Sequence, residues 1–227
     1  MPPCAIDKFI KTTMKQKSDL IFDYWKKFVN TPSKPIKDWF KKENEFLKKN
    51  IQKNSMVLDV GIGYGRNIES IANIAKKIVG IDKSKFLLKE IESLTKKYPN
   101  IEFFCEDAKK MHFKDSSFDY VLCLGNTFGD FAKNRLSILE EMKRVCKKGG
   151  QIYISVYSEN AIKFRIKEYE RIGIKILKID DGEIYTQDKL KLEQFNKKKL
   201  EQIFKDASLE VKIIKLNRIS YMCVAKK

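Results

Sequence analysis

Short apolar runs alternate with amphipathic stretches through the middle of the chain. Five runs have the length and the β-branched and aromatic content of buried strands, at residues 56–60, 78–81, 101–105, 120–124 and 152–156. Apolar residues recur at helical spacing between these runs, at 66–76, 84–98 and 134–147. Strands that alternate with helices in this way predict an α/β fold with a doubly wound, mostly parallel sheet.

The flanking segments have other patterns. Residues 1–50 have the spacing of two amphipathic helices, at about 7–29 and 36–49, which we expect to form an N-terminal helical lid on a main domain at 51–227. Asp181–Gly182 is a strong two-residue turn signal, so a β-hairpin insertion is expected at about 174–187. The remaining expected elements are a helix at 160–172, a strand at 190–195, a helix at 197–207 and a strand at 211–224.

The sharpest motif begins where the first strand ends. Residues 57–66 are VLDVGIGYGR, so a strand runs into Gly61, Gly63 and Gly65 and then into a helix. Such a turn brings backbone N–H groups and a helix N-terminus close to an anionic part of a nucleotide-like ligand. A dinucleotide fingerprint needs glycine where this chain has Arg66. Asp59, just before the glycines, suits a cationic amino group better than a pyrophosphate.

Two further acids follow the next two strands. Asp82 ends the second strand, where a carboxylate can accept both ribose hydroxyls. Asp107 ends the third, placed to accept from an exocyclic adenine amine while the Ala108 N–H donates to the ring. Each acid alone is compatible with a turn or cap, and the glycine loop alone with a tight turn that binds nothing. Together they predict a nucleotide-like cofactor site.

The order of these motifs resembles that of the class I S-adenosylmethionine-dependent methyltransferases, including the methyltransferase type 11-like members. The resemblance covers roughly residues 56–157 and includes VLDVGIGYGR, VGIDKSKFLLKEI and EEMKRVCKKGGQIYISVYS. It implies S-adenosylmethionine as the cofactor and a Rossmann-like, seven-stranded sheet with an antiparallel last strand. It also implies a set of cofactor contacts: Asp59, Gly61, Gly63 and Gly65 at the methionine end, Asp82 at the ribose, and Asp107 with Ala108 at the adenine.

The fourth strand ends in LGNTFGD, next to the expected position of the activated methyl group. Asn126 can accept from an amine nucleophile and Phe128 can wall off the methyl, whereas a cap and a core residue are the structural alternatives. The segment resembles the corresponding loop of small-molecule amine methyltransferases of the glycine and sarcosine type. It resembles the N-P-P-[YF] loop of nucleic-acid amino-methyltransferases more loosely.

Methyl transfer from a sulfonium mainly needs alignment and exclusion of water, so a dedicated base is not required. The only histidine, His112, fits a loop residue better than a base. On the acceptor side we expect Tyr24, Trp25 and Phe28 as lid residues. The alternative for this aromatic stripe is packing of the N-terminal helices onto the core.

Composition adds one ambiguity. The formal net charge is +17, which is a footprint of nucleic-acid binding, but only six of the 47 basic residues are Arg and the lysines are spread along the chain. A solvated lysine surface is therefore favoured. The five cysteines contain no C-x-x-C, which argues against a zinc site or disulfide framework, so no metal is expected. No long apolar run or signal-like start is present, which favours a cytoplasmic protein without a membrane partner.

The sequence leaves three functional hypotheses open. The leading one is a methyltransferase that acts on a small-molecule acceptor, with nitrogen favoured over oxygen or carbon. An RNA methyltransferase, for tRNA or rRNA, that uses the lysine-rich surface is the runner-up. A catalytically silent protein that binds S-adenosylmethionine is the third, and the intact set of glycines and acids argues against it.

Overall fold

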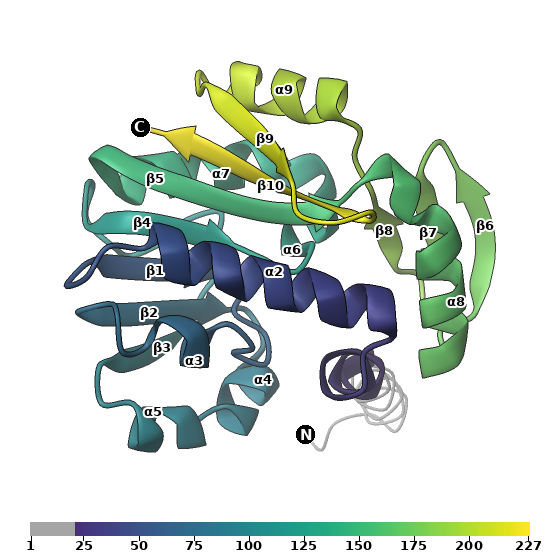
Figure 1. The fold of residues 1–227 in the computed structure, drawn as a ribbon, viewed down its shortest axis with the longest axis horizontal. Coiled ribbons are helices and arrows are strands. Elements are labelled where there is room, and N and C mark those ends of the chain that lie inside the picture. Colours follow the sequence, from purple (N-terminus) through teal and green to yellow (C-terminus); the bar gives the residue numbers. More distant parts are fainter. Residues whose placement is uncertain (1–20) are drawn as a thin grey trace, which may run out of the picture.

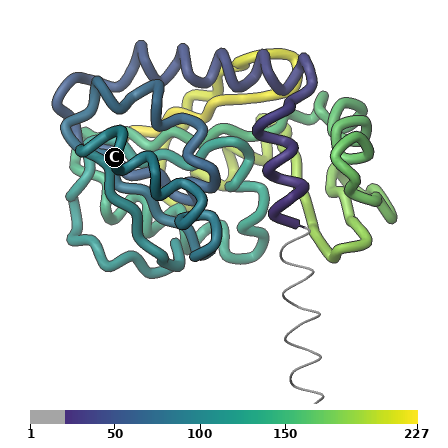
Figure 2. The backbone as a smooth tube through the Cα atoms, turned by 90° about the horizontal axis from the view of Figure 1, so that it is seen from below, coloured from purple at the N-terminus to yellow at the C-terminus, as the bar shows by residue number. Residues whose placement is uncertain are grey.

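The computed structural model describes residues 21–227. Its first part is helical, at 21–30 and in α2 (Lys34–Asn50), and the rest of the expected first helix lies outside the described residues. Ser33 precedes α2 and Pro35 lies in its first turn, where the missing N–H of proline costs no helical bond. Figure 1 shows α2 lying across one face of the sheet. Figure 2 shows that the helix at 21–30 runs in a different direction from α2, which follows it.

The centre of the molecule is one seven-stranded sheet in the order β3-β2-β1-β4-β5-β10-β9. Strands β1 to β5 are parallel, and β10 is antiparallel to both β5 and β9. This confirms the predicted doubly wound α/β fold. The strands are β1 (Met56–Val60), β2 (Lys77–Asp82), β3 (Ile101–Cys105), β4 (Phe118–Cys123), β5 (Cys146–Tyr157), β9 (Val211–Lys215) and β10 (Ser220–Lys226).

Helices cover both faces of this sheet (Figure 1). They are α3 (Ile68–Ile71), α4 (Lys85–Glu90), α5 (Ser93–Lys97), α6 (Thr127–Asp130), α7 (Arg135–Val145) and α9 (Lys197–Asp206). The helix expected at 66–76 is only the short α3, because the chain must turn early for the Lys76 and Lys77 N–H groups to reach the Ser55 carbonyl. The helix expected at 84–98 divides into α4 and α5, and the Ser84 hydroxyl caps α4 as expected.

The insertion is larger than the expected hairpin. Strands β6 (Ile176–Asp180) and β7 (Glu183–Thr186) form the hairpin, and β8 (Lys191–Glu193) pairs with β7 as a third strand. The strand expected at 190–195 therefore belongs to this small sheet and not to the main one. The segment expected as one strand at 211–224 is divided into two strands, β9 and β10, which complete the main sheet. The chain turns between them at Asn217, whose side-chain oxygen accepts from the Ile219 N–H at 3.0 Å.

Three apolar clusters hold these layers together. One lies between the sheet and helices α7 and α9, and a second between the sheet and helices α2, α3 and α5. The third joins the N-terminal helices to the insertion and to α8 (Ile162–Ile172), and the fully buried Trp39 packs edge-on against Tyr157 within it at 4.7 Å. The N-terminal helices are thus anchored to the end of the sheet where β5 leads into the insertion.

Candidate active site

The glycine loop bends sharply at the carboxyl end of β1. Gly61, Gly63 and Gly65 have φ of +72°, +55° and +64°, a region that residues with a Cβ rarely adopt. A Cβ on Gly61 would lie 2.3 Å from the Thr127 side chain, so the loop also approaches the loop after β4 too closely for any larger residue. The sequence motif is explained by backbone conformation and by this close approach.

Asp82 holds the loop from the end of β2. One carboxylate oxygen accepts the Gly63 N–H at 3.1 Å, and the other accepts the Ser84 N–H at 2.9 Å. Each carboxylate oxygen can accept a second hydrogen bond, so this side chain can hold the loop and still receive hydroxyl groups from a ligand. Asp82 is half-buried and lines the cavity described below.

Asp59 is a buried residue of β1 and lines the same cavity. Burial raises the pKa of its carboxyl to about 7, the Glu43 and Asp82 carboxylates act in the same direction, and the Arg66 guanidinium opposes them. Among the described residues, no cation lies within ion-pair distance of the Asp59 side chain. A buried carboxylate in this state favours a ligand that brings its own positive charge.

A buried polar cluster around Glu43 lies behind the glycine loop, and sequence reasoning missed it. Glu43 lies on α2 and is fully buried, where its carboxylate pairs with Arg66 and accepts from the Ser155 hydroxyl. Asn67 donates to the same carboxylate at 2.9 Å, and the Gly125 N–H contacts it at 3.4 Å. Helix α2, the glycine loop, the β4 loop and β5 therefore meet at one side chain. In the sequence Glu43 is one more charge in a lysine-rich helix.

Asp107 and Ala108 lie beyond β3, at the rim of the cavity. The Asp107 side chain is 61% exposed, and its carboxylate accepts the Lys109 N–H at 2.9 Å. That backbone hydrogen bond lowers the pKa of Asp107. His112, in contrast, is not among the cavity-lining residues and contacts Glu106 through its Nδ1 atom.

The loop after β4 differs from the expectation in its details. Asn126 has a φ of 72° and is buried, and its side-chain oxygen accepts the Tyr157 N–H at 3.0 Å while its amide donates to the Glu193 carbonyl. Asn126 lines the cavity, but both ends of its amide hold neighbouring strands. Phe128 is fully buried against Phe195 and is not a lining residue, so the structure places it in the core and not at the methyl position.

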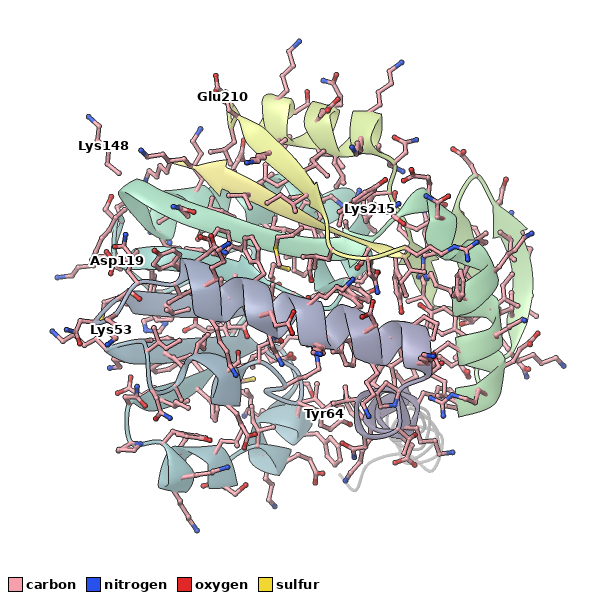
Figure 3. The ribbon with its side chains drawn as sticks, in the orientation of Figure 1. Lys53, Tyr64, Asp119, Lys148, Glu210 and Lys215 are labelled. Carbon is pink, nitrogen blue, oxygen red and sulfur yellow. The ribbon has the colours of Figure 1, made fainter. Side chains whose placement is uncertain are left out.

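One cavity of about 780 Å³ joins these features. The glycine loop and the ends of β2 and β3 line one side, and residues 21–29, α8 and the segment between β7 and β8 line the other. Trp25 and Phe28 line it from the N-terminal helix, whereas Tyr24 is buried outside the lining residues. Tyr64 from the glycine loop lies beside this helix, donating its hydroxyl to the Phe22 carbonyl at 2.8 Å (Figure 3).

Comparison with known proteins shows that this chain is similar to methyltransferases. Residues 57–150 match the family model described as a methyltransferase domain. The chain is 35% identical over 125 residues to a demethylmenaquinone methyltransferase of Bacillus licheniformis, covering 52% of this chain and 51% of that protein. It is 34% identical over 95 residues to the Methanococcus aeolicus protein named "Probable ribosomal RNA small subunit methyltransferase A", covering 40% of this chain and 35% of that one.

A solved structure extends the likeness over the whole fold. The Burkholderia thailandensis 1,6-didemethyltoxoflavin-N1-methyltransferase, with its acceptor and S-adenosylhomocysteine bound, matches with a TM-score of 0.67 at 14% identity, covering 100% of this chain and 92% of that one. This chain therefore shares its overall fold with a methyltransferase, and its residues 57–150 match a methyltransferase domain. The chain spans less than two thirds of the length of the first curated relatives it matches. The names of the similar proteins refer to demethylmenaquinone, to small-subunit ribosomal RNA and to 1,6-didemethyltoxoflavin.

The methyltransferase domain and its relatives support S-adenosylmethionine as the cofactor. The residues present fit this molecule. Asp59 is the buried carboxylate that lacks a cation, and the amino group of the methionine end provides one. The carboxylate of Asp82 keeps acceptor capacity for the ribose, and Asp107 and Ala108 lie at the rim where the adenine is expected.

Two features are absent from residues 21–227. No group of three or more His, Cys, Asp or Glu side chains in this part of the chain is arranged to hold a metal ion. None of its helices is both long and apolar enough to cross a membrane.

Proposed function

We propose that this methyltransferase domain transfers a methyl group from S-adenosylmethionine to a small-molecule acceptor, at nitrogen. The observation that carries the proposal is the cavity of about 780 Å³, which continues from the glycine loop to the N-terminal helix and the insertion. Volumes of about 300–1,000 Å³ are typical of small-molecule sites. Aromatic side chains on the acceptor side, Trp25, Phe28 and Tyr169, favour a compact organic acceptor over a polymer.

The cofactor supplies an activated methyl group on a positively charged sulfur. The protein's own contribution is to bind, to orient and to exclude water. In this proposal Asp59 and Asp82 hold the cofactor against the glycine loop, and Asn126 fixes the β4 loop by bridging Tyr157 and Glu193. Trp25 and Phe28 close the acceptor side, and Tyr24 supports them from the core, near Asp188.

The test is a labelled-methyl transfer assay on a cell extract separated into small-molecule, RNA and protein fractions. The proposal expects label in the small-molecule fraction, and expects alkaline-stable N-methyl products there. Label in RNA at a defined nucleotide would replace it with the second candidate. Tight binding of S-adenosylhomocysteine without transfer to any fraction would support a silent cofactor-binding protein.

An RNA acceptor is the second candidate. Two observations favour it: the formal charge of +17 and the likeness to the ribosomal RNA methyltransferase of Methanococcus aeolicus. The cavity argues against it, because the N-terminal helix crosses its acceptor side and is tied to α4 by the Lys26–Glu90 ion pair at 2.7 Å. A nucleotide within a polymer would require this helix to move aside.

A further inference from the structure

One carboxylate on the acceptor side of the cavity has no partner within the described fold. Asp130 ends α6, and its side chain is accessible from the cavity that it lines. Within residues 21–227, no hydrogen bond or ion pair holds this carboxylate. The nearby Arg135 is already paired with Glu193, which also binds Lys199. Asp130 is therefore an exposed acid on the cavity lining, without a protein partner among the described residues.

The charges that face Asp130 come from three other elements. Arg165 approaches from α8, Lys83 from the end of β2 and Arg135 from α7. Although the Asp130 side chain is open to the cavity, desolvation by the protein around that cavity outweighs all three charges and raises the pKa of Asp130 to about 7. Arg165 itself is fully buried, and its guanidinium donates to the Tyr169 hydroxyl at 2.9 Å while its Nη1 has no partner among the described residues. No ion pair joins it to Asp130 within residues 21–227. Near neutral pH this carboxyl can both bind a cation and accept a proton.

The surroundings of Asp130 suit an organic cation. Tyr157 lines the cavity, and its buried hydroxyl has no partner among the described residues. Trp25, Phe131 and Tyr169 add aromatic surface to the same cavity. Aromatic faces attract cations through the negative charge of the ring face, and a carboxylate supplies the countercharge. A neutral alcohol brings no countercharge to the Asp130 carboxylate, and an acidic acceptor adds repulsion.

Resting on the proposed methyltransferase function, we propose that Asp130 binds the ammonium group of a primary or secondary amine acceptor and takes its proton. In that step one N–H bond breaks, its electron pair stays on nitrogen, and the proton forms an O–H bond with the Asp130 carboxylate. The neutral amine then carries the lone pair that a methyl acceptor needs. The proton leaves Asp130 to water when the product departs. The acceptor class is thus an alkylamine next to an apolar or aromatic group.

The experiment measures binding of matched probes to the full chain saturated with S-adenosylhomocysteine, by calorimetry. The probes are 2-phenylethylamine and tryptamine, each with the alcohol and the carboxylic acid of the same skeleton. The amines are expected to bind at least about tenfold more tightly than their alcohols. In Asp130→Asn the amine affinity is expected to fall about 10- to 150-fold, the range for a lost charged hydrogen bond.

Two controls make the result decisive. Asp206→Asn, the same substitution on the exposed end of α9, is expected to leave both affinities unchanged. Affinity for S-adenosylhomocysteine, measured on every variant, reports that the site is folded.

Alcohols that bind as tightly as amines, undetectable amine binding, or unchanged amine affinity in Asp130→Asn would each overturn the proposal. If that variant still methylates the small-molecule fraction at full rate, the role of Asp130 fails while the proposed function stands. If the unmodified chain does not bind S-adenosylhomocysteine, the proposed methyltransferase function itself is wrong.

Discussion

Asp82 gives the most direct test of the cofactor site at the scale of single residues. Its two oxygens accept the Gly63 and Ser84 N–H groups, so Asp82→Ala removes the loop support and, in the proposed binding mode, the acceptor for the ribose hydroxyls. We expect the affinity for S-adenosylhomocysteine to fall by about 5- to 150-fold, equivalent to about 1–3 kcal/mol. Calorimetry measures this, with the exposed Glu102→Ala on β3 as the control. Equal affinities of the two variants would contradict it.

Asp59 predicts a pH dependence of stability. Its folded pKa of about 7 lies above the value of about 4 expected in an unfolded chain. Between these values the folded protein holds more protons than the unfolded one, so the free energy of unfolding falls as pH rises from about 4 to 7. Asp59→Asn removes this contribution. We expect its melting temperature, measured without cofactor, to fall less than that of the unmodified protein over this pH interval. Parallel curves would exclude the effect.

Sequence reasoning found the residues whose surroundings depend on the local sequence. It missed those whose surroundings depend on distant segments. Asp59 and Asp82 follow strands and flank a glycine loop, so their positions depend on local pattern. Glu43 and Asp130 acquire their chemistry only when distant elements close around them. A charge in a lysine-rich helix and an acid in a turn have no local signal that separates them from solvated side chains.

At the scale of elements, α2 is expected to depend on Glu43 for its attachment to the domain. Glu43→Ala leaves the half-buried Arg66 guanidinium, 14% exposed, without its carboxylate and leaves Asn67 and Ser155 without their acceptor. We expect a loss of about 3–5 kcal/mol in the free energy of unfolding, measured by urea denaturation. Glu45→Ala is the control on the same helix, because its carboxylate is 60% exposed and its ion pair is expected to contribute less than about 1 kcal/mol. Similar losses in both variants would refute the special role of Glu43.

The N-terminal helix gives a second test at this scale. Trp25 lines the cavity and packs edge-on against Tyr169 at 6.2 Å. If this helix is the acceptor lid, Trp25→Ala should lower kcat/KM for the acceptor by about 30-fold or more, as for a buried aromatic anchor. Affinity for S-adenosylhomocysteine should change little. The exposed Lys27→Ala on the same helix serves as the control, and unaltered turnover by Trp25→Ala would remove the lid role.

Elements were predictable where periodicity alone decides them. The first four parallel strands, α2, α7, α9 and the hairpin lie close to their expected positions because their apolar patterns match burial on one or both faces, whereas β5 begins at Cys146, six residues before the expected strand at 152–156. The assignment of β8 and the division of the last strand were wrong in the sequence reading. The position of β8 depends on which sheet has a free edge for it, and the division of the last strand depends on the turn at Asn217. Hydrophobic spacing indicates neither of them.

At the scale of the whole molecule, the basic charge is distributed over the surface. Lys53, Lys148 and Lys215 are exposed in separate parts of the molecule (Figure 3). We therefore expect weak RNA binding without sequence preference, with an affinity that falls steeply with salt as counterions are displaced. Filter binding at low and physiological salt measures this. Tight binding of one RNA at physiological salt would instead indicate a recognition surface.

The buried contacts of Glu43 also constrain the order in which the chain can assemble. Glu43 and Ser155 are separated by 112 positions, and α2 leaves the ribosome well before β5 has been made. Until Gly125 and Ser155 are present, burying the Glu43 carboxylate would leave it with only the partners from the glycine loop. We therefore expect helix α2 to pack against the sheet only after the central strands have formed. In a pulse-labelling hydrogen-exchange experiment, the amides of α2 should gain protection after those of β1 and β4.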